Sequence, residues 1–150
     1  MNLIKKILIT RQGRKFYAKD INQDLHTQYG YVKKEELKKA KEGDLVKSNT
    51  GKEFFILNPS FIDLYRKIKR DAQIIPLKDI GLIIAETGIN KSSKVLDAGS
   101  GSGALACFLA AIAKEVVSYE IREDFIEIVK SNIEFLKLKN IKIKIIIIIP

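Results

Sequence analysis

The residues best suited to chemistry lie in the stretch Asp-Ala-Gly-Ser-Gly-Ser-Gly, which begins at Asp97 and ends at Gly103. It follows a short apolar segment, and its glycines at alternate positions let the backbone turn tightly and approach a ligand closely. An apolar segment at residues 105–113 is predicted to form a helix whose first N–H groups face the turn. Because open α/β sheets bind ligands at the carboxyl ends of their strands, we predict a ligand site at this turn.

A second carboxylate, Glu120, ends the next apolar run at residues 115–119. Its separation from the turn is close to the ~20 residues at which a second-strand carboxylate binds ribose hydroxyls. The pattern Asp-x-Gly-x-Gly-x-Gly differs from the dinucleotide pattern Gly-x-Gly-x-x-Gly, and Asp97 favours a ligand with an ammonium group over a pyrophosphate. S-adenosylmethionine has an amino-acid end, a sulfonium cation and a ribose. We therefore predict this cofactor and a Rossmann-like methyltransferase core, with a purely structural strand–helix turn as the alternative.

The elements after the turn are predicted to extend the sheet and cover it. Residues 122–137 carry apolar side chains at three- and four-residue intervals, which predicts an amphipathic helix. Residues 141–149 are predicted to form a third strand that ends in five consecutive isoleucines, a run typical of a strand buried on both faces. Because a Rossmann-like domain needs more strands, we expect a truncated chain. A terminal strand covered by helices or by a partner chain is the alternative.

The N-terminal part of the chain has the pattern of a small β domain. Residues 2–58 contain short strands separated by turns, among them a hairpin with Gly51 in its turn, and a charged helix near residues 33–41. Residues 61–70 and 78–88 then show helical periodicity. The predicted fold class is α/β, with a small, mostly antiparallel β N-terminal domain followed by the first half of a Rossmann-like methyltransferase domain. The predicted division is a small β domain at residues 1–58, a helical linker at residues 59–90 and the partial Rossmann-like domain at residues 91–150.

The composition narrows the class of partner and the compartment. The 150 residues carry a formal net charge of +9, which favours a polyanion such as nucleic acid, although a genome rich in lysine and isoleucine gives the same balance without any function. The single cysteine, Cys107, fits a reducing cytoplasm and supports neither a disulfide framework nor a metal cluster. The chain has no signal-peptide core and no run of the ~20 apolar residues that a membrane helix needs. We predict no metal and no membrane partner.

Several motifs resemble those of one enzyme family over almost the whole chain. They are His26-Thr27-x-x-Gly30, Glu42-Gly43-Asp44-x-Val46-x-Ser48-x-x-Gly51-x-x-Phe54-x-Ile56-Leu57-x-Pro59-Ser60, Lys69-Arg70-x-Ala72-Gln73-Ile74-Ile75, Lys78-Asp79, residues 95–104 and Ser118-Tyr119-Glu120-x-Arg122-x-Asp124-Phe125. In these motifs the chain is similar to the N-terminal half of the tRNA (adenine-N1) methyltransferases of the TrmI type. The glycine-rich motif fits any class I methyltransferase, whereas the motifs around His26 and Ala72 are much more specific.

The resemblance implies a reaction, its partners and a set of cofactor contacts. It implies a β domain that helps to hold tRNA, methyl transfer from S-adenosylmethionine to N1 of an adenine in the tRNA T-loop, and a homo-oligomer, usually a tetramer. Glu120 would bind the ribose hydroxyls, Phe125 would pack near the adenine edge, and Gln73 would lie near the mouth of the cofactor site. The methionine end would be bound by Asp97 and the turn residues Gly99, Ser100, Gly101, Ser102 and Gly103.

The sequence also departs from the family pattern. Pro76 and Leu77 stand where the family has an aromatic residue and then a proline, and residues 145–149 offer no acidic residue near the cofactor adenine. The family's catalytic aspartate lies at the end of a fourth strand that has no counterpart here, so we assign no catalytic residue and leave open whether the chain is an enzyme by itself.

Three functions stay open from the sequence. The predicted function is an S-adenosylmethionine-dependent tRNA (adenine-N1) methyltransferase that is truncated before the catalytic aspartate. The alternatives are an inactive tRNA- or nucleoside-binding paralogue and a methyltransferase for a substrate other than tRNA. In the first interpretation Lys67, Lys69 and Arg70 form a tRNA-facing patch, and otherwise they are a solvated helix face.

Overall fold

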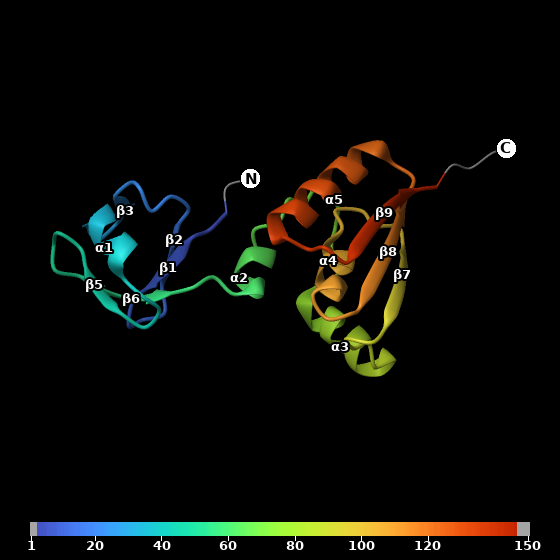
Figure 1. The fold of residues 1–150 in the computed structure, drawn as a ribbon, viewed down its shortest axis with the longest axis horizontal. Helices are drawn as coiled ribbons and strands as arrows, with labels where there is room; N and C mark the ends of the chain where they lie inside the picture. The colour runs from blue at the N-terminus through green and yellow to red at the C-terminus, as the bar shows by residue number, and fades with distance from the viewer. Residues whose placement is uncertain (1–2, 147–150) are drawn as a thin grey trace. The chain divides into compact units, whose positions relative to one another are not determined.

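The computed structural model describes residues 3–146, and Figure 1 shows the helices and strands. The chain forms two compact units, and the division falls between Asp63 and Leu64. The first unit is mostly antiparallel β-structure, and the second contains a parallel sheet with helices. The finer division at residues 58 and 90 that the sequence suggests stays a prediction.

The first unit is built on a four-stranded antiparallel sheet in the order β2-β1-β6-β5, accompanied by the hairpin β3–β4 and the short helix α1. The predicted hairpin around Gly51 is present between β5 and β6, and Gly51 has a φ of +85°. The bounds are β1 Lys6–Ile9, β2 Lys15–Ala18, β3 Leu25–Thr27, β4 Gly30–Val32, α1 Lys34–Lys39, β5 Leu45–Lys47 and β6 Glu53–Leu57, and α2 Phe61–Tyr65 lies at the division between the units.

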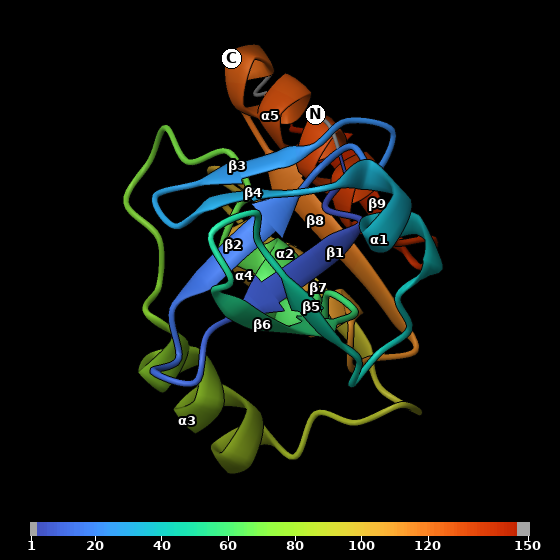
Figure 2. The same cartoon turned by 90° about the vertical axis from the view of Figure 1, so that its left-hand side faces the viewer.

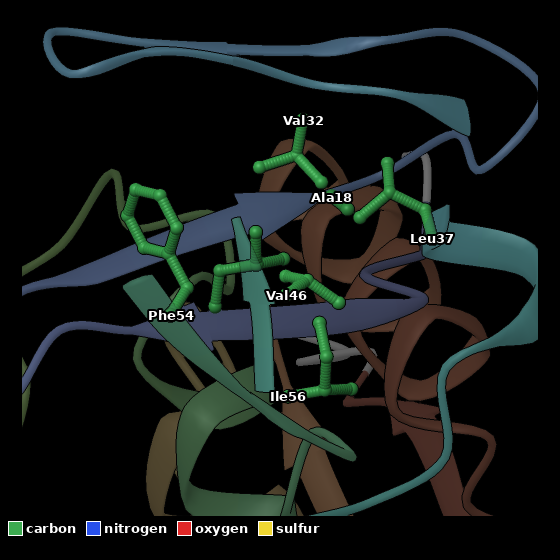
Figure 3. Packing of buried hydrophobic residues seen from close by; sticks show 7 residues of the cluster. Ala18, Val32, Leu37, Val46, Phe54 and Ile56 are labelled. Carbon is green, nitrogen blue, oxygen red and sulfur yellow. The ribbon is translucent and has the colours of Figure 1, made fainter. Parts of the chain in front are cut away.

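One face of this sheet carries the hydrophobic core of the first unit. Phe54 and Ile56 are two residues apart on β6, so their side chains point to the same face, and both are buried. Val32 from β4 and Leu37 from α1 belong to the same cluster (Figure 3). The hairpin and the helix therefore cover this face of the sheet (Figure 2).

The β3–β4 hairpin, which the sequence did not predict as strands, is tied to the turn between β5 and β6. Tyr31 N donates to Asn49 Oδ1 and Asn49 N donates to Tyr31 O, both at 2.9 Å. Thr50 Oγ1 donates to Tyr29 O at 2.8 Å. Two of the motifs that carry the family resemblance, the one that contains Gly30 and the one that contains Ser48 and Gly51, thus meet at these hydrogen bonds.

Gly30 lies at the tightest point of this contact. Its φ is +88°, and a Cβ atom there would lie 2.2 Å from Asn49 Oδ1. We expect Gly30→Ala to lower the free energy of unfolding by about 2–3 kcal/mol, because the methyl group strains the backbone and displaces a hydrogen-bonded side chain. Urea unfolding measures the loss. Gly13→Ala is the matched control, since Gly13 has a φ of +82° with nothing within 4 Å of the added Cβ. An equal loss in both variants would contradict the role given to Asn49.

The second unit contains a three-stranded parallel sheet in the order β7-β8-β9. Helix α4 connects β7 to β8, and helix α5 connects β8 to β9, which is the strand–helix alternation expected from the sequence. The two helices pack against the sheet (Figure 1), and Val116, Ser118 and Glu120 of β8 are the buried residues of that strand. The bounds are α3 Leu77–Thr87, β7 Lys94–Ala98, α4 Ala104–Ala110, β8 Glu115–Glu120, α5 Glu123–Leu136 and β9 Ile141–Ile145.

The helix predicted over residues 61–70 is shorter in the structure, because α2 ends at Tyr65. The backbone of residues 69–72 is diverted from helical hydrogen bonding by tertiary contacts. Lys69 N donates to the side chain of Asn132, and the backbone N–H groups of residues 71 and 72 donate to Ser102 Oγ. Side chains distant in the sequence thus override the local helical periodicity.

The third strand is present as β9, but the described part of the isoleucine run is not buried on both faces. Ile145 and Ile146 are 44% and 41% exposed. The physical reason is that β9 is an edge strand of the three-stranded sheet. Residues 147–149, the rest of the predicted strand, lie outside the described residues.

Candidate functional site

The glycine-rich turn joins β7 to α4 and is anchored on the end of β8. Gly99 N and Ser100 N donate to Tyr119 O at 2.9 and 3.0 Å. Gly99 has a φ of +91°, and a Cβ atom there would meet nothing within 4 Å. The backbone at Gly99 is therefore open on the side where a side chain would stand, which leaves room for a ligand to approach it closely.

The other two glycines have structural tasks. Gly103 has a φ of +73°, and a Cβ atom there would lie 2.8 Å from Val129 Cγ1 of α5, so the missing side chain permits close packing of the turn on that helix. Gly101 has a φ of +52°, and its N–H donates to Glu120 Oε2 at 2.8 Å. The spacing of the glycines thus serves the turn and its packing as well as access for a ligand.

Glu120 is 6% exposed and accepts three backbone hydrogen bonds. Besides the bond from Gly101, its Oε1 accepts from Ile121 N at 2.8 Å and Arg122 N at 3.1 Å. Burial by itself raises the pKa of this carboxyl group, but the N–H donors and the charge of Arg122 lower it below its ordinary value. A carboxylate has about four acceptor positions, so about one remains for a ligand hydroxyl.

Asp97 lies on the same face of the sheet as Glu120. In the parallel pairing of β7 with β8, Asp97 is opposite Ser118, and Ser118 and Glu120 are two residues apart on β8. Asp97 is half-buried, and its Oδ2 accepts a hydrogen bond from Ser118 Oγ at 2.5 Å. The two acidic side chains therefore flank the glycine-rich turn from adjacent strands.

The two serines of the turn use their side chains inside the protein. Ser100 Oγ hydrogen-bonds Ser118 Oγ, and its one hydrogen is shared with Tyr119 O at 3.1 Å. Ser102 Oγ accepts from the N–H groups of Asp71 and Ala72 at 3.1 and 3.2 Å. Neither hydroxyl points freely toward solvent, so their predicted cofactor contacts would come from the backbone.

Gln73 and Phe125, the other two predicted cofactor contacts, lie on different segments of the chain. Gln73 is exposed and directly follows the residues held by Ser102. Phe125 is half-buried in the first turn of α5, and the Arg122 guanidinium stands over its ring at 4.1 Å from the centroid. The segment around Gln73 thus reaches the glycine-rich turn through backbone hydrogen bonds, whereas the ring of Phe125 contacts Arg122.

Two polar residues at the site were not singled out from the sequence. Asn132 is 0% exposed on α5 and hydrogen-bonds both the backbone of Lys69 and the carbonyl of Ser102. Ser118 is buried beneath Asp97. The available signal was a polar residue within an otherwise apolar pattern, Asn132 beside Ile133 on the helix and Ser118 after two valines on the strand. Such a residue indicates a buried hydrogen-bonding task.

Residues 3–146 contain neither a cluster of metal ligands nor a membrane-crossing helix. No group of three or more His, Cys, Asp or Glu side chains is arranged to hold a metal ion there. No helix in the same range has both the length and the apolar character needed to cross a membrane. His26, the single histidine of the sequence, is exposed on β3 opposite Tyr31.

Comparisons with solved structures define the class of protein. A SAM-dependent O-methyltransferase from Thermotoga maritima superposes with a TM-score of 0.81 at 28% identity, covering 96% of this chain and 56% of that one. The tRNA (m1A58) methyltransferase TrmI from Aquifex aeolicus superposes with a TM-score of 0.76 at 28% identity, covering 95% and 57%. The chain therefore has a Rossmann-like methyltransferase fold preceded by an antiparallel β unit.

Sequence comparisons identify relatives of the chain within this class of methyltransferases. The family described as ribosomal RNA adenine dimethylase matches residues 77–147. The tRNA (adenine(57)-N(1)/adenine(58)-N(1))-methyltransferase TrmI of Methanocaldococcus jannaschii is 34% identical over 131 residues, 85% of this chain and 45% of that protein. The tRNA (adenine(58)-N(1))-methyltransferase TrmI of Thermus thermophilus is 30% identical over 121 residues, 78% of this chain and 48% of that protein. The chain is related to the TrmI-type tRNA (adenine-N1) methyltransferases, and the match fits their N-terminal part. It spans about half the length of these curated relatives.

Proposed function

We propose that this chain is the cofactor-binding part of an S-adenosylmethionine-dependent methyltransferase that acts on N1 of an adenine in tRNA. The observation that carries the proposal is the pair of carboxylates, Asp97 and Glu120, on one face of the sheet beside the open backbone of Gly99. Such a pair suits a ligand with an ammonium group at one end and ribose hydroxyls at the other.

The residues of the site fit this cofactor from one end to the other. The backbone at Gly99 and the free oxygen of Asp97 would hold the amino-acid end, and the remaining acceptor position of Glu120 would hold a ribose hydroxyl. Phe125 would pack near the adenine, and Gln73 would lie at the mouth of the site. When bound, S-adenosylmethionine supplies an electrophilic methyl group. The residues of this chain bind and orient it, and we assign no catalytic residue among them.

The extent of the match supports tRNA as the substrate. The ribosomal RNA adenine dimethylase family matches from residue 77 onward, less than half of the chain. The match to the M. jannaschii protein covers 131 residues, more than the second unit contains, so it extends into the β unit. A tRNA substrate is consistent with the cytoplasm as the compartment. A homo-oligomer, expected from the resemblance, is part of the same proposal.

A run of exposed basic residues supports an RNA partner. Arg66, Lys67, Lys69 and Arg70 are exposed, and the backbone of Lys69 is held by Asn132. The next residues of this segment are hydrogen-bonded to Ser102 in the glycine-rich turn. Lys and Arg side chains bind RNA phosphates through electrostatic attraction. We propose this segment as a tRNA-binding surface beside the cofactor site.

Titration calorimetry with S-adenosylhomocysteine, the cofactor without its methyl group, tests cofactor binding by the 150-residue chain. We expect one saturable site and an affinity about tenfold weaker in Asp97→Asn, because the variant loses a charge-assisted hydrogen bond to the ammonium group. Glu127→Gln, which changes an exposed carboxylate of α5, is the control and should leave the affinity unchanged. A folded wild-type chain that binds no S-adenosylhomocysteine would reject the proposal.

A methyl-transfer assay on unmodified tRNA separates the proposed function from its alternatives. Formation of N1-methyladenosine supports the proposed enzyme. The assay is also run on a longer form of the protein that is extended to the length of the relatives. If both the chain and this longer form bind cofactor and tRNA but transfer no methyl group, the protein is an RNA-binding paralogue. The similarity to an O-methyltransferase structure favours a further candidate, transfer to another acceptor. Transfer to a small hydroxyl acceptor but not to tRNA would identify it.

A further inference from the structure

A chain of hydroxyl groups lies directly beneath Asp97 and ends on it. Ser118 is 0% exposed, and its Oγ donates to Asp97 Oδ2 at 2.5 Å. Ser100 is also buried, and its Oγ is hydrogen-bonded to Ser118 Oγ. Two hydroxyls from the glycine-rich turn and from β8 are therefore connected to one oxygen of a half-buried carboxylate.

The direction of these hydrogen bonds follows from the number of hydrogens. A serine hydroxyl has one hydrogen to donate and can also accept. Because Ser118 gives its hydrogen to Asp97, the hydrogen between the two serines must come from Ser100, which shares this one hydrogen with Tyr119 O at 3.1 Å. Ser118 then accepts from Ser100 and donates to Asp97, and consecutive hydrogen bonds of this kind strengthen one another.

A hydroxyl at Ser118 is not the simplest way to fill this position. Alanine would occupy a buried site on a strand without needing a hydrogen-bond partner. Within residues 3–146, no side chain other than Ser118 is hydrogen-bonded to Asp97. On the inner side, Cys107 is buried close enough that burial, together with the negative charge of Asp97, raises the pKa of its thiol to about 12. The Ser118 hydroxyl thus provides the hydrogen bond that holds Asp97 on this side.

We propose that Ser118, supported by Ser100, is a positioning residue for Asp97. It holds Oδ2 toward the sheet and thereby leaves the other carboxylate oxygen for the ammonium group of an amino-acid ligand. This inference rests on the proposed function, because that function supplies the ammonium group. It adds a specific consequence, namely that Ser118 sets the affinity for the amino-acid end and leaves the affinity for the nucleoside end unchanged.

Two ligands measured side by side test this consequence. S-adenosylhomocysteine has both ends, whereas 5′-methylthioadenosine has the nucleoside and the sulfur but no amino-acid group. We expect Ser118→Ala to weaken S-adenosylhomocysteine binding about tenfold and 5′-methylthioadenosine binding less than about twofold. The ratio of the two affinities does not depend on the folded fraction of a variant. Ser92→Ala, the same substitution at an exposed serine, is the control and should leave both affinities unchanged.

Two further variants complete the experiment. Ser100→Ala should weaken S-adenosylhomocysteine binding selectively but by less, because Ser118 still donates to Asp97, and it decides the question if Ser118→Ala does not fold. In an Asp97→Asn background, Ser118→Ala should add little, since the two residues act as one unit.

The outcomes separate this inference from the proposed function. Failure of the wild-type chain to bind S-adenosylhomocysteine rejects both. If the wild-type chain binds and Ser118→Ala keeps the wild-type affinity ratio, the proposed function stands and the positioning role is wrong. Equal weakening of both ligands would likewise overturn the inference, because it would show that Ser118 supports the fold of the whole site.

Discussion

Asn132→Ala is expected to lower the free energy of unfolding by about 3–4 kcal/mol. The side-chain nitrogen of Asn132 donates to Lys69 O at 3.0 Å and to Ser102 O at 2.9 Å, and its Oδ1 accepts from Lys69 N at 2.8 Å. Because Asn132 is 0% exposed, truncation removes the side-chain partner of three backbone groups, of which the Ser102 carbonyl lies in a buried hydrogen bond. Leaving a buried polar group unpaired costs roughly 1–3 kcal/mol for each group.

Asn132→Leu separates the lost hydrogen bonds from the lost volume. Leucine fills a similar space, so a loss as large as that of the alanine variant would assign the effect to hydrogen bonding. Urea unfolding gives the free energies, and hydrogen exchange should show faster exchange at the amide of Lys69, which donates to Asn132. Lys130→Ala on the exposed face of the same helix is the control. Near-wild-type stability in Asn132→Leu would contradict this assignment.

The sequence predicted the elements with a strong local pattern. The periodicity at residues 122–137 and the apolar run before Glu120 gave α5 and β8 close to their observed bounds. The positive φ values at Gly99, Gly101 and Gly103 agree with the conformational freedom inferred from their spacing. These features could be predicted because each is determined by residues near one another in the chain.

The features that sequence analysis missed depend on contacts between distant residues. The predicted helix at residues 61–70 ends at Tyr65, and beyond it the backbone of residues 69–72 is hydrogen-bonded to Asn132 and Ser102, which lie far along the chain. The β3–β4 hairpin is only three residues long in each strand, and it is attached to the rest of the unit by hydrogen bonds to Asn49 and Thr50. Local periodicity carries no information about such partners.

The sequence predicted the acidic residues and the turn of the candidate site, but not the side chains that hold them in place. Asp97 and Glu120 share a face because β7 and β8 pair in a register that places Asp97 opposite Ser118. The register between two strands is determined by packing and cannot be predicted from the sequence of either strand alone. The roles of Ser118 and Asn132 became apparent only from their hydrogen bonds. Cofactor binding by the predicted residues stays a prediction.

Glu120→Gln is expected to abolish measurable S-adenosylhomocysteine binding or to weaken it more than about thirtyfold. The amide is a poor substitute because all three neighbours of the carboxylate are N–H donors. If the amide oxygen accepts from Ile121 and Arg122, its NH2 group faces the N–H of Gly101, and two donors repel each other. The variant therefore loses the charge that we propose binds the ribose, and at the same time it displaces the glycine-rich turn. Calorimetry measures the affinity, and the exposed Glu127→Gln serves as the control.

The stability of this variant should also depend on pH in a defined way. The folded-state pKa of Glu120 is lowered, since its backbone donors and Arg122 outweigh the opposing effect of burial. A group with a lowered folded-state pKa stabilises the fold at pH values above its unfolded-state pKa. This contribution is lost as the pH falls through the folded-state pKa. The difference in unfolding free energy between wild type and Glu120→Gln should thus be full at pH 7 and shrink in acid below the ordinary glutamate pKa. Other carboxyl groups with lowered pKa values, such as Asp63, are common to both proteins and cancel in the difference. A difference that stays constant from pH 7 into strong acid would show that the charge of Glu120 does not hold the turn. The connection between β8 and the glycine-rich turn would then depend on the Tyr119 carbonyl and on the Ser100–Ser118 hydrogen bond.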